Sequence, residues 1–503
     1  MSANFVLIAL ALVTGWLALF PIRKVLGAWG YHVSAWLVGL LAWTVVTSLT
    51  TLVGSGYSWG AVVAGHLLFV IVLGLAGTLL LRTDVVEASG DVAWWTWLVG
   101  GAGVLGAGAA CVFRGVTMVA FDSYTHYDLS GLWLLDTGQI DTTVIGGRNV
   151  LVPSLHAAVR FFGGEWTYAV YPMLSLTALI LLFTVLKTQA FCTIRLRYQI
   201  GLSALLVAVL AATPGWVFHS FFVHSNMISA TYLILAVTGI GFASRFGELS
   251  DKPEAWAWTL LAGLGIAGLT LSRPDGLAYL FVPLALAALL YLGGYLGTKS
   301  YVILAASMFA PILVVYGATI AELGVWNAYK LDGIVVVALI GAAAAFWRFF
   351  CCVRSCAPFR DWLELRGNSI RLAVAVNVVT VLPLVYWKRE DFVPALSNMI
   401  GNLLQHGEWG FLWYALAGVV VISLVFSGIM RRSHWSWYLL YALAQFFCVA
   451  AVVHGIAHPG RLSWMDSFNR VSLHVLPIAF WYVGSFMGAL FDSYRDGDEG
   501  SSA

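Results

Sequence analysis

The stretch FDSYTHYDLSGLWLLDTGQID, residues 121–141, concentrates carboxylates in a chain that is otherwise poor in charge. It carries Asp122, Asp128, Asp136 and Asp141, although only 10% of the 503 residues are charged and 61% are hydrophobic. Apolar runs long enough to cross a membrane lie on both sides of it. The stretch is therefore predicted to connect membrane spans, and the question is which side it faces and what needs carboxylates there.

Outward from this stretch, apolar runs of about 20 residues repeat along the chain, as in a polytopic membrane protein. A helix satisfies its own backbone hydrogen bonds in hydrocarbon, so such runs cross as helices. We predict an all-α polytopic membrane protein with about 13–15 transmembrane helices and with interfacial helices in the 121–165 outer loop. The net charge of +2 points to no nucleic-acid partner. The candidate spans are 3–20, 33–53, 61–81, 94–114, 166–187, 198–218, 226–243, 255–271, 276–296, 301–320, 333–350, 371–387, 411–429, 435–454 and 471–490.

The orientation follows from the basic residues in the connections between these spans. If the N-terminus is outside, Lys and Arg collect in the inner connections, including the basic cluster at 348–371, as the positive-inside tendency predicts. The segment 121–165 is then the longest extracytoplasmic connection, and its carboxylates face the exterior, periplasm or lumen. The other outer connections that carry unusual polar residues are 272–276, 388–410 and 458–470.

The cysteines give a clue to the compartment. None of them falls in an outer connection, so no structural disulfide is predicted. The cluster CCVRSC at 351–356 has no further Cys or His beside it, so we interpret it as membrane-edge cysteines and predict no metal site. The sequence contains no Asn-x-Ser/Thr acceptor, which favours a bacterial origin and hence a bacterial inner (plasma) membrane. Because the unusual polar residues lie in the outer connections, we expect the active face outside the cytoplasm.

Asp122 differs from the other aspartates because it lies where a predicted span meets the membrane surface. A carboxylate at that depth is costly unless a partner or a reaction uses it. His126 follows four residues later, on the same face of a helix. Asp128 and Asp136 are interpreted as helix caps or surface residues. A second surface helix is predicted from VPSLHAAVRFFGG at 152–164, so that two interfacial helices joined by a polar loop lie over the membrane.

Two further outer turns carry charges. In SRPDG, residues 272–276, Pro274 suits the start of the following helix and Asp275 its first turn, but this interpretation leaves Arg273 unexplained. In the last outer turn, Arg470 and His474 continue a spacing of four residues that begins at Asp466. This spacing is explained equally well by a local ion pair and by a functional site.

These motifs resemble those of the GT-C superfamily of membrane glycosyltransferases. The resemblance rests on a carboxylate just after a span, on surface helices with D-x-Y-x-H, on the SRPDG turn and on FNRVSLHVLP at 468–477, and it covers chiefly 115–290 and 455–490. Two features depart from the family. Several predicted spans precede the loop, where members usually show the aspartate after the first span, and the frequent C-terminal soluble domain does not follow the spans.

The resemblance implies an organisation and a chemistry. The chain would divide into N-terminal transmembrane helices (1–93), a GT-C-like core (94–300), C-terminal transmembrane helices (301–491) and a short polar tail (492–503). The enzyme would move a sugar from a polyprenyl-phosphate donor to a glycan, lipid or protein acceptor of the cell envelope. Asp122 would be the catalytic base. The substrate-binding residues would be His126, Arg273, Asp275, Arg470 and His474.

The cofactor stays open in this interpretation. His126 would either orient Asp122 or join it in binding a divalent cation, as in some members of the family. Other classes of protein also fit the composition. A secondary transporter or lipid-linked glycan flippase would predict interrupted helices and charges near the bilayer midplane. A polysaccharide polymerase or ligase would favour an arginine-rich late loop, whereas 388–410 has only Lys388 and Arg389.

Overall fold

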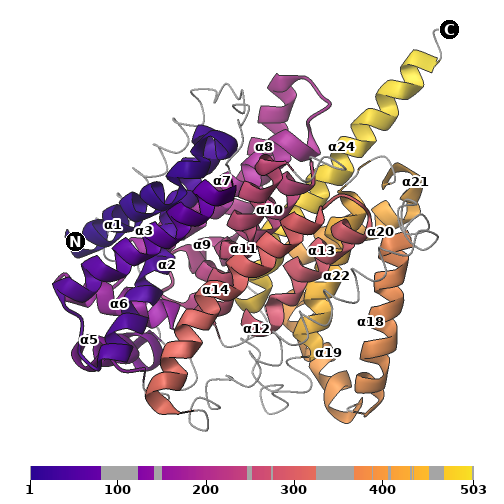
Figure 1. The fold of residues 1–503 in the computed structure, drawn as a ribbon. Helices are drawn as coiled ribbons and strands as arrows, with labels where there is room; N and C mark the ends of the chain where they lie inside the picture. Colours follow the sequence, from indigo (N-terminus) through magenta and orange to yellow (C-terminus); the bar gives the residue numbers. More distant parts are fainter. Residues whose placement is uncertain are drawn as a thin grey trace. The chain divides into compact units, whose positions relative to one another are not determined.

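The computed structural model confirms an all-α chain (Figure 1). It describes residues 2–80, 123–140, 150–245, 252–273, 276–324, 368–387, 389–405, 409–430, 433, 435–452 and 470–500. Within these ranges no β-strand occurs. The predicted spans 94–114 and 333–350 and the cysteine cluster at 351–356 lie outside the described residues.

The chain forms two compact units, which are described one at a time. Unit 1 consists of Met1–Thr177, Ser220–Leu280 and Gly294–Ala357, and unit 2 consists of Ala178–His219, Phe281–Gly293 and Pro358–Ala503. The helices of unit 1 are α1 (Ser2–Leu19), η1 (Phe20–Ile22), α2 (Arg23–Val53), α3 (Trp59–Leu80), η3 (Ser123–Asp128), α5 (Leu129–Thr137), α6 (Leu151–Phe161), α10 (Ser225–Ser244), α11 (Pro253–Ser272), α12 (Gly276–Tyr279) and α14 (Thr298–Leu323), with the start of α7 (Val170–Val185).

Unit 2 contains the rest of α7 and the later helices. These are η4 (Leu186–Ala190), α8 (Leu196–Ala211), α9 (Pro214–Ser220, all but its last residue), α13 (Phe281–Leu292), α18 (Asn368–Trp387), α19 (Arg389–Leu404), α20 (Leu412–Val425), α21 (Ser427–Met430), α22 (Ser436–Val452), η9 (Ser472–Val475) and α24 (Leu476–Gly500).

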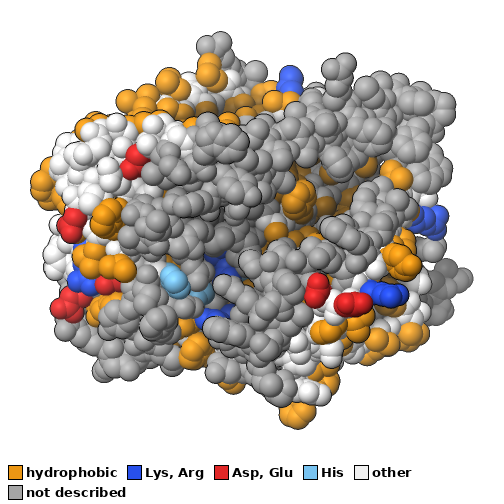
Figure 2. Space-filling view, turned by 90° about the horizontal axis from the view of Figure 1, so that it is seen from below, with side chains coloured by type: hydrophobic (Ala, Val, Ile, Leu, Met, Phe, Trp, Pro, Cys, Tyr) orange, Lys and Arg blue, Asp and Glu red, His pale blue; other side chains and the backbone are white. Residues whose placement is uncertain are grey.

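Eight helices in the described part of the chain are long and apolar enough to cross a membrane, or nine if one bent pair is counted as a span. The protein is therefore an integral, multi-pass membrane protein. The eight are Ala3–Gly27, Gly30–Val53, Trp59–Leu80, Val170–Ala190, Ser225–Ser244, Pro253–Ser272, Thr298–Glu322 and Ser472–Tyr494. Hydrophobic side chains are common on the described part of the surface in Figure 2, and charged ones are sparse.

Two predicted spans are not single straight helices. The segment predicted at 198–218 forms α8 and α9, which meet at a bend of 74°. Pro214 begins α9, and the missing N–H of a proline explains why one helix stops before it and another starts with it. The segment predicted at 276–296 forms α12 and the 12-residue α13, which at 1.5 Å per residue is shorter than the hydrocarbon core. The predicted outer connection 388–410 contains the helix α19.

Unit 1 is built on close helix pairs. α10 and α11 lie side by side (Figure 1), and both are buried along almost their whole length, as apolar all-round helices in a bundle are. α1 and α2 cross where small residues permit it: a Cβ on Gly15 would stand 1.6 Å from the Ala35 carbonyl oxygen, and one on Gly39 1.7 Å from that of Ala11. Small residues at such crossings let helix backbones approach where apolar burial alone cannot hold helices together.

The connections predicted to lie outside meet at one end of unit 1. The turn after α2 contacts α5, where the Tyr57 N–H donates to the Leu135 carbonyl at 2.9 Å and the Thr51 hydroxyl to the Gly138 carbonyl at 2.9 Å. Gly138 ends α5 in the left-handed conformation at φ 70°, which glycine adopts without strain. The start of α1 reaches the same end, since the Asn4 side-chain amide donates to the Trp166 carbonyl at 2.7 Å.

Contacts of α10, α11 and α14 are consistent with this arrangement. The Ile140 N–H contacts Glu322 Oε2, near the end of α14, at 3.4 Å. The opposite ends of α10, α11 and α14 also meet, since Phe242 stacks on Trp258 at 4.5 Å and the Lys299 ammonium lies 5.0 Å from the Trp256 ring. These contacts agree with the predicted alternation of outer and inner connections along unit 1. Which of the two ends faces the exterior stays a prediction.

Labelling of intact cells with a membrane-impermeant maleimide tests this orientation. Asp136 is exposed at the end that carries α5, so Asp136→Cys should react with reagent added outside. The natural Cys192 is exposed in a connection predicted to be cytoplasmic, so it should react only after the membrane is opened. The protein without the new cysteine and the variant Cys192→Ser identify the two signals. Labelling in the reverse pattern would invert the protein and contradict the predicted topology.

Candidate functional site

The described part of the carboxylate-rich connection starts with a π-helix, η3, that runs directly into α5. π-Helical turns are rare and are found frequently at functional sites. Asp128 is the last residue of η3, and its side chain is buried. The interpretation of Asp128 as a helix cap was wrong, because it makes no side-chain capping bond to α5. Asp136 is exposed near the end of α5, as predicted for a surface residue.

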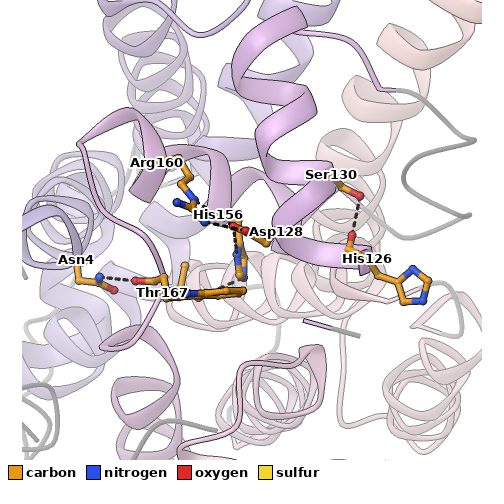
Figure 3. Close-up of polar contacts among 8 residues, drawn as sticks. Asn4, His126, Asp128, Ser130, His156, Arg160 and Thr167 are labelled. Atoms are coloured by element: carbon orange, nitrogen blue, oxygen red, sulfur yellow. Dashed lines mark hydrogen bonds and ion pairs between the residues drawn. The ribbon is translucent and has the colours of Figure 1, made fainter. Parts of the chain in front are cut away.

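Asp128 pairs instead with an arginine 32 residues later (Figure 3). Arg160 donates from Nε to Oδ1 at 3.2 Å and from Nη2 to Oδ2 at 2.8 Å, which is the bidentate geometry that suits a guanidinium and a carboxylate. Asp128 ends η3 and Arg160 belongs to α6, so the pair joins the two helical parts of the connection. The packing agrees, since a Cβ on Gly131 of α5 would stand 2.7 Å from the His156 Cβ of α6.

His156 completes the cluster from the buried face of α6. Its Nδ1 lies 3.7 Å from Asp128 Oδ1, which is too long for a direct hydrogen bond. Its Nε2 lies 3.3 Å from the Thr167 hydroxyl. α6 was predicted to be a surface helix, but every residue from Leu151 to Val159 is buried within the protein, because α6 packs between α5 and the helices α1, α2 and α11. Its position relative to the membrane stays a prediction.

Burial and charge act in opposite directions on the two titratable groups of this cluster. Burial alone would raise the pKa of Asp128, but His156 and Arg160 together outweigh it and hold the pKa below its ordinary value. Burial lowers the pKa of His156, and Arg160 adds to this effect, whereas Asp128 only partly offsets it. At neutral pH the cluster therefore contains a carboxylate, a guanidinium and a neutral imidazole.

Polar contacts continue from this cluster to the first turn of α10. The Tyr127 ring stacks on His156 with centroids 6.4 Å apart and meets His224 edge-on at 5.5 Å. Its hydroxyl lies 2.9 Å from the Ser225 hydroxyl, which lies 3.5 Å from His224 Nδ1. All of these side chains are buried. Tyr127 thus links the Asp128 cluster to the start of α10, in surroundings that exclude solvent.

The same turn of α10 contacts the end of α11. The Arg273 guanidinium donates from Nη1 to the side-chain oxygen of Asn226, and one turn further along α10 the Ser229 hydroxyl lies 2.8 Å from that of Ser272. Arg273 follows α11 in an extended conformation. Asn226 is fully buried, so part of the role of Arg273 is explained by this contact between the two helices.

The predicted site residues fall into three groups. Asp122 and Asp275 lie outside the described residues. His126 and Arg273 belong to unit 1 and are partly exposed. Figure 3 shows the His126 side chain directed away from Asp128, so it does not join the Asp128 cluster. α12 begins at Gly276, directly after Pro274 and Asp275.

Arg470 and His474 belong to unit 2. Arg470 precedes η9 and is partly exposed, whereas His474 lies within η9, is fully buried and meets the Phe446 ring of α22 edge-on at 6.4 Å. Asp466 lies outside the described residues. A cavity shared by Asp122, Arg273 and Arg470 stays a prediction.

Sequence reasoning missed the Asp128 cluster and Asn226. Arg160 is a cation in an otherwise apolar helix, and Asn226 is a polar amide in the first turn of a span; both are signals that a search for buried polar residues would have found. In the part of the chain that the structure describes, no group of three or more His, Cys, Asp and Glu side chains is placed to bind a metal ion.

Comparison with known proteins gives no relative from which to transfer a role. No family model, no curated protein and no solved structure matches this chain.

Breaking the Asp128–Arg160 pair should destabilise the protein. Asp128 is buried but Arg160 is partly exposed, so water compensates part of the charge that is left, and Asp128→Asn should lower the free energy of unfolding by about 1–3 kcal/mol. Thermal denaturation of the purified protein in detergent measures the effect. Asp136→Asn, at an exposed aspartate of the same connection, is the matched control and should change little. Equal melting temperatures for the two variants would contradict a structural role of the pair.

His156 should make the stability fall as the medium becomes acidic. Its pKa in the folded protein is below the value of about 6.5 in an unfolded chain. Below that pH the unfolded chain binds a proton that the folded protein does not, so stability is lost as pH falls from 7 to 5. The pKa of Asp128 is lowered too, and its contribution is lost only below about pH 4.

Melting temperatures of wild type and His156→Gln, compared between pH 7 and pH 5, isolate this contribution. All other histidines are common to both proteins, so the variant should lose less stability across this interval than the wild type. Parallel curves for the two proteins would show that His156 is not held neutral by the fold.

Proposed function

We propose that the protein is a membrane glycosyltransferase of the GT-C type that moves a sugar from a polyprenyl-phosphate donor to an acceptor on the extracytoplasmic face. The observation that carries the proposal is the packing of the carboxylate-rich connection onto one end of unit 1. There its residues contact the first turn of α10, and Arg273 contacts the same turn. A reaction at the membrane surface needs acidic and basic groups at such an end, where a lipid phosphate also lies.

Each group has a chemical role in this proposal. Asp122, which directly precedes η3, removes the proton from the acceptor hydroxyl while its oxygen attacks the anomeric carbon. The bond between that carbon and the phosphate oxygen breaks, and polyprenyl phosphate leaves with the electron pair. Arg273 and Arg470 stabilise the growing charge on the phosphate. His474 and Asp275 would assist in binding the donor.

The position of Asp128 supports a rigid arrangement of this connection. Its bidentate bond to Arg160 fixes the end of η3 on α6, and Ser123 to Asp128 form one continuous helical segment. A base must be held within hydrogen-bonding distance of the acceptor hydroxyl, so an anchored segment suits it better than a free loop. His126 lies on this segment too, and it would either orient Asp122 or bind a divalent cation with it.

One observation favours a transporter or a lipid flippase. The bend of 74° between α8 and α9 is the kind of interrupted helix that such proteins use at substrate sites. The polar cluster of the site described above, however, lies at helix ends in unit 1 and not along α8 and α9. Uptake or flipping that occurs without glycosyl transfer would favour this alternative.

The proposal predicts that Asp122→Asn abolishes most transfer. The substitution keeps the shape of the side chain but removes the proton acceptor, so transfer from a polyprenyl-phosphate sugar should fall by about 10² to 10⁴. Donor binding should change little, since the phosphate is assigned to the arginines. Transfer is measured in membranes at matched expression.

Two comparisons sharpen this test. Asp136→Asn serves as the control and should leave transfer near the wild-type rate, because Asp136 is exposed on α5. Arg470→Ala should weaken donor binding and turnover together, since it removes a charge from the leaving group. Normal turnover in Asp122→Asn would reject the assignment of the base.

A further inference from the structure

Asn226 is a polar side chain with an unused donor. It is fully buried in the first turn of α10, and its oxygen accepts a bond from the Arg273 guanidinium. Among the residues that the structure describes, no acceptor lies within hydrogen-bonding distance of its Nδ2. The orientation of the amide is fixed by chemistry, because a guanidinium only donates and the oxygen must face it. A buried amide nitrogen without an acceptor is costly, and each such group calls for an explanation.

The surroundings of this amide suit an anion. The first N–H groups of a helix have no partner within it and carry the positive end of the helix dipole. His224 precedes α10 in an extended conformation and makes no side-chain capping bond to it, while the Ser225 hydroxyl is engaged with Tyr127. The start of α10, the Asn226 amide and the Arg273 guanidinium thus bring donors and positive charge to one place.

We propose that Asn226 Nδ2 and Arg273 together bind a phosphate oxygen, and that the ligand is the phosphate of the polyprenyl donor. The identity of this ligand rests on the proposed function. Asn226 holds the guanidinium through its oxygen and donates to the phosphate from its nitrogen. A neutral amide is also less costly to bury at the start of a span than a second cation would be.

The test measures binding alone, with no sugar and no acceptor present. Purified protein in detergent is titrated with a polyprenyl phosphate, with the corresponding polyprenol and with inorganic phosphate, and the thermal shift reports binding. The wild type should bind the polyprenyl phosphate more tightly than the polyprenol. Asn226→Asp keeps an acceptor for Arg273 but replaces the donor with a negative charge, so the Kd for polyprenyl phosphate should rise by about tenfold or more.

Two further variants control for folding. Ser229→Ala changes a buried polar residue one turn further along α10 and should bind like the wild type. Asn226→Ala removes the donor without adding charge, so it applies the same test if Asn226→Asp does not fold. Wild-type affinity for polyprenyl phosphate in a folded Asn226 variant would overturn the inference. An Asn226 variant that loses binding to inorganic phosphate but keeps wild-type affinity for polyprenyl phosphate would also overturn the inference. The site would then bind a free anion and not the lipid phosphate.

The outcome is independent of the test of Asp122. Binding that depends on Asn226, found together with normal transfer in Asp122→Asn, would keep the phosphate site and reject the base. Transfer that depends on Asp122, with binding indifferent to Asn226, would reject the phosphate site alone.

Discussion

In hydrocarbon a polar group must find its partner within the protein, and this constraint governs the whole chain. It makes every described element a helix, because helices satisfy their own backbone hydrogen bonds. It also separates the side chains of unit 1: apolar residues cover α3 toward the bilayer, while the polar cluster of the connection lies at helix ends. The candidate site is located where the constraint is weakest.

The Asp128–Arg160 pair is best understood as a device for specificity. A buried ion pair contributes little net stability compared with apolar packing, because desolvation opposes the attraction between the charges. It does, however, require Asp128 of η3 and Arg160 of α6 to lie side by side. α6 in turn packs against α1, α2 and α11, so its contact with η3 also positions η3 relative to these spans. The described part of the connection thereby packs onto the core of unit 1. The residues of η3 before Asp128 are held in a defined position.

The fold class could be predicted because membrane spans are recognised by the length and apolar composition of a segment. The bend at Pro214 was not predicted, because apolar residues continue on both sides of this proline as they would in a single span. The Asp128–Arg160 pair could not be predicted, since a carboxylate before a helix looks like a cap and nothing local points to a partner 32 residues later. The burial of α6 depended on tertiary packing in the same way. The role of Asp122 stays a prediction, since this residue lies outside the described part of the chain. The Asn226 amide shows that a search for charges alone overlooks a neutral polar residue in a span.

The crossing of α1 and α2 has a consequence for the order of assembly. Gly15 and Gly39 each admit the backbone of the opposite helix, so the crossing is reciprocal and uses only residues near the N-terminus. This hairpin can close while the rest of the chain is still being synthesised, because its contacts are local in sequence. Its finished end, the turn at Gly54, then presents the surface on which α5 docks. The α1–α2 hairpin precedes α5 in the chain, so the surface to which the connection binds is made before the connection itself.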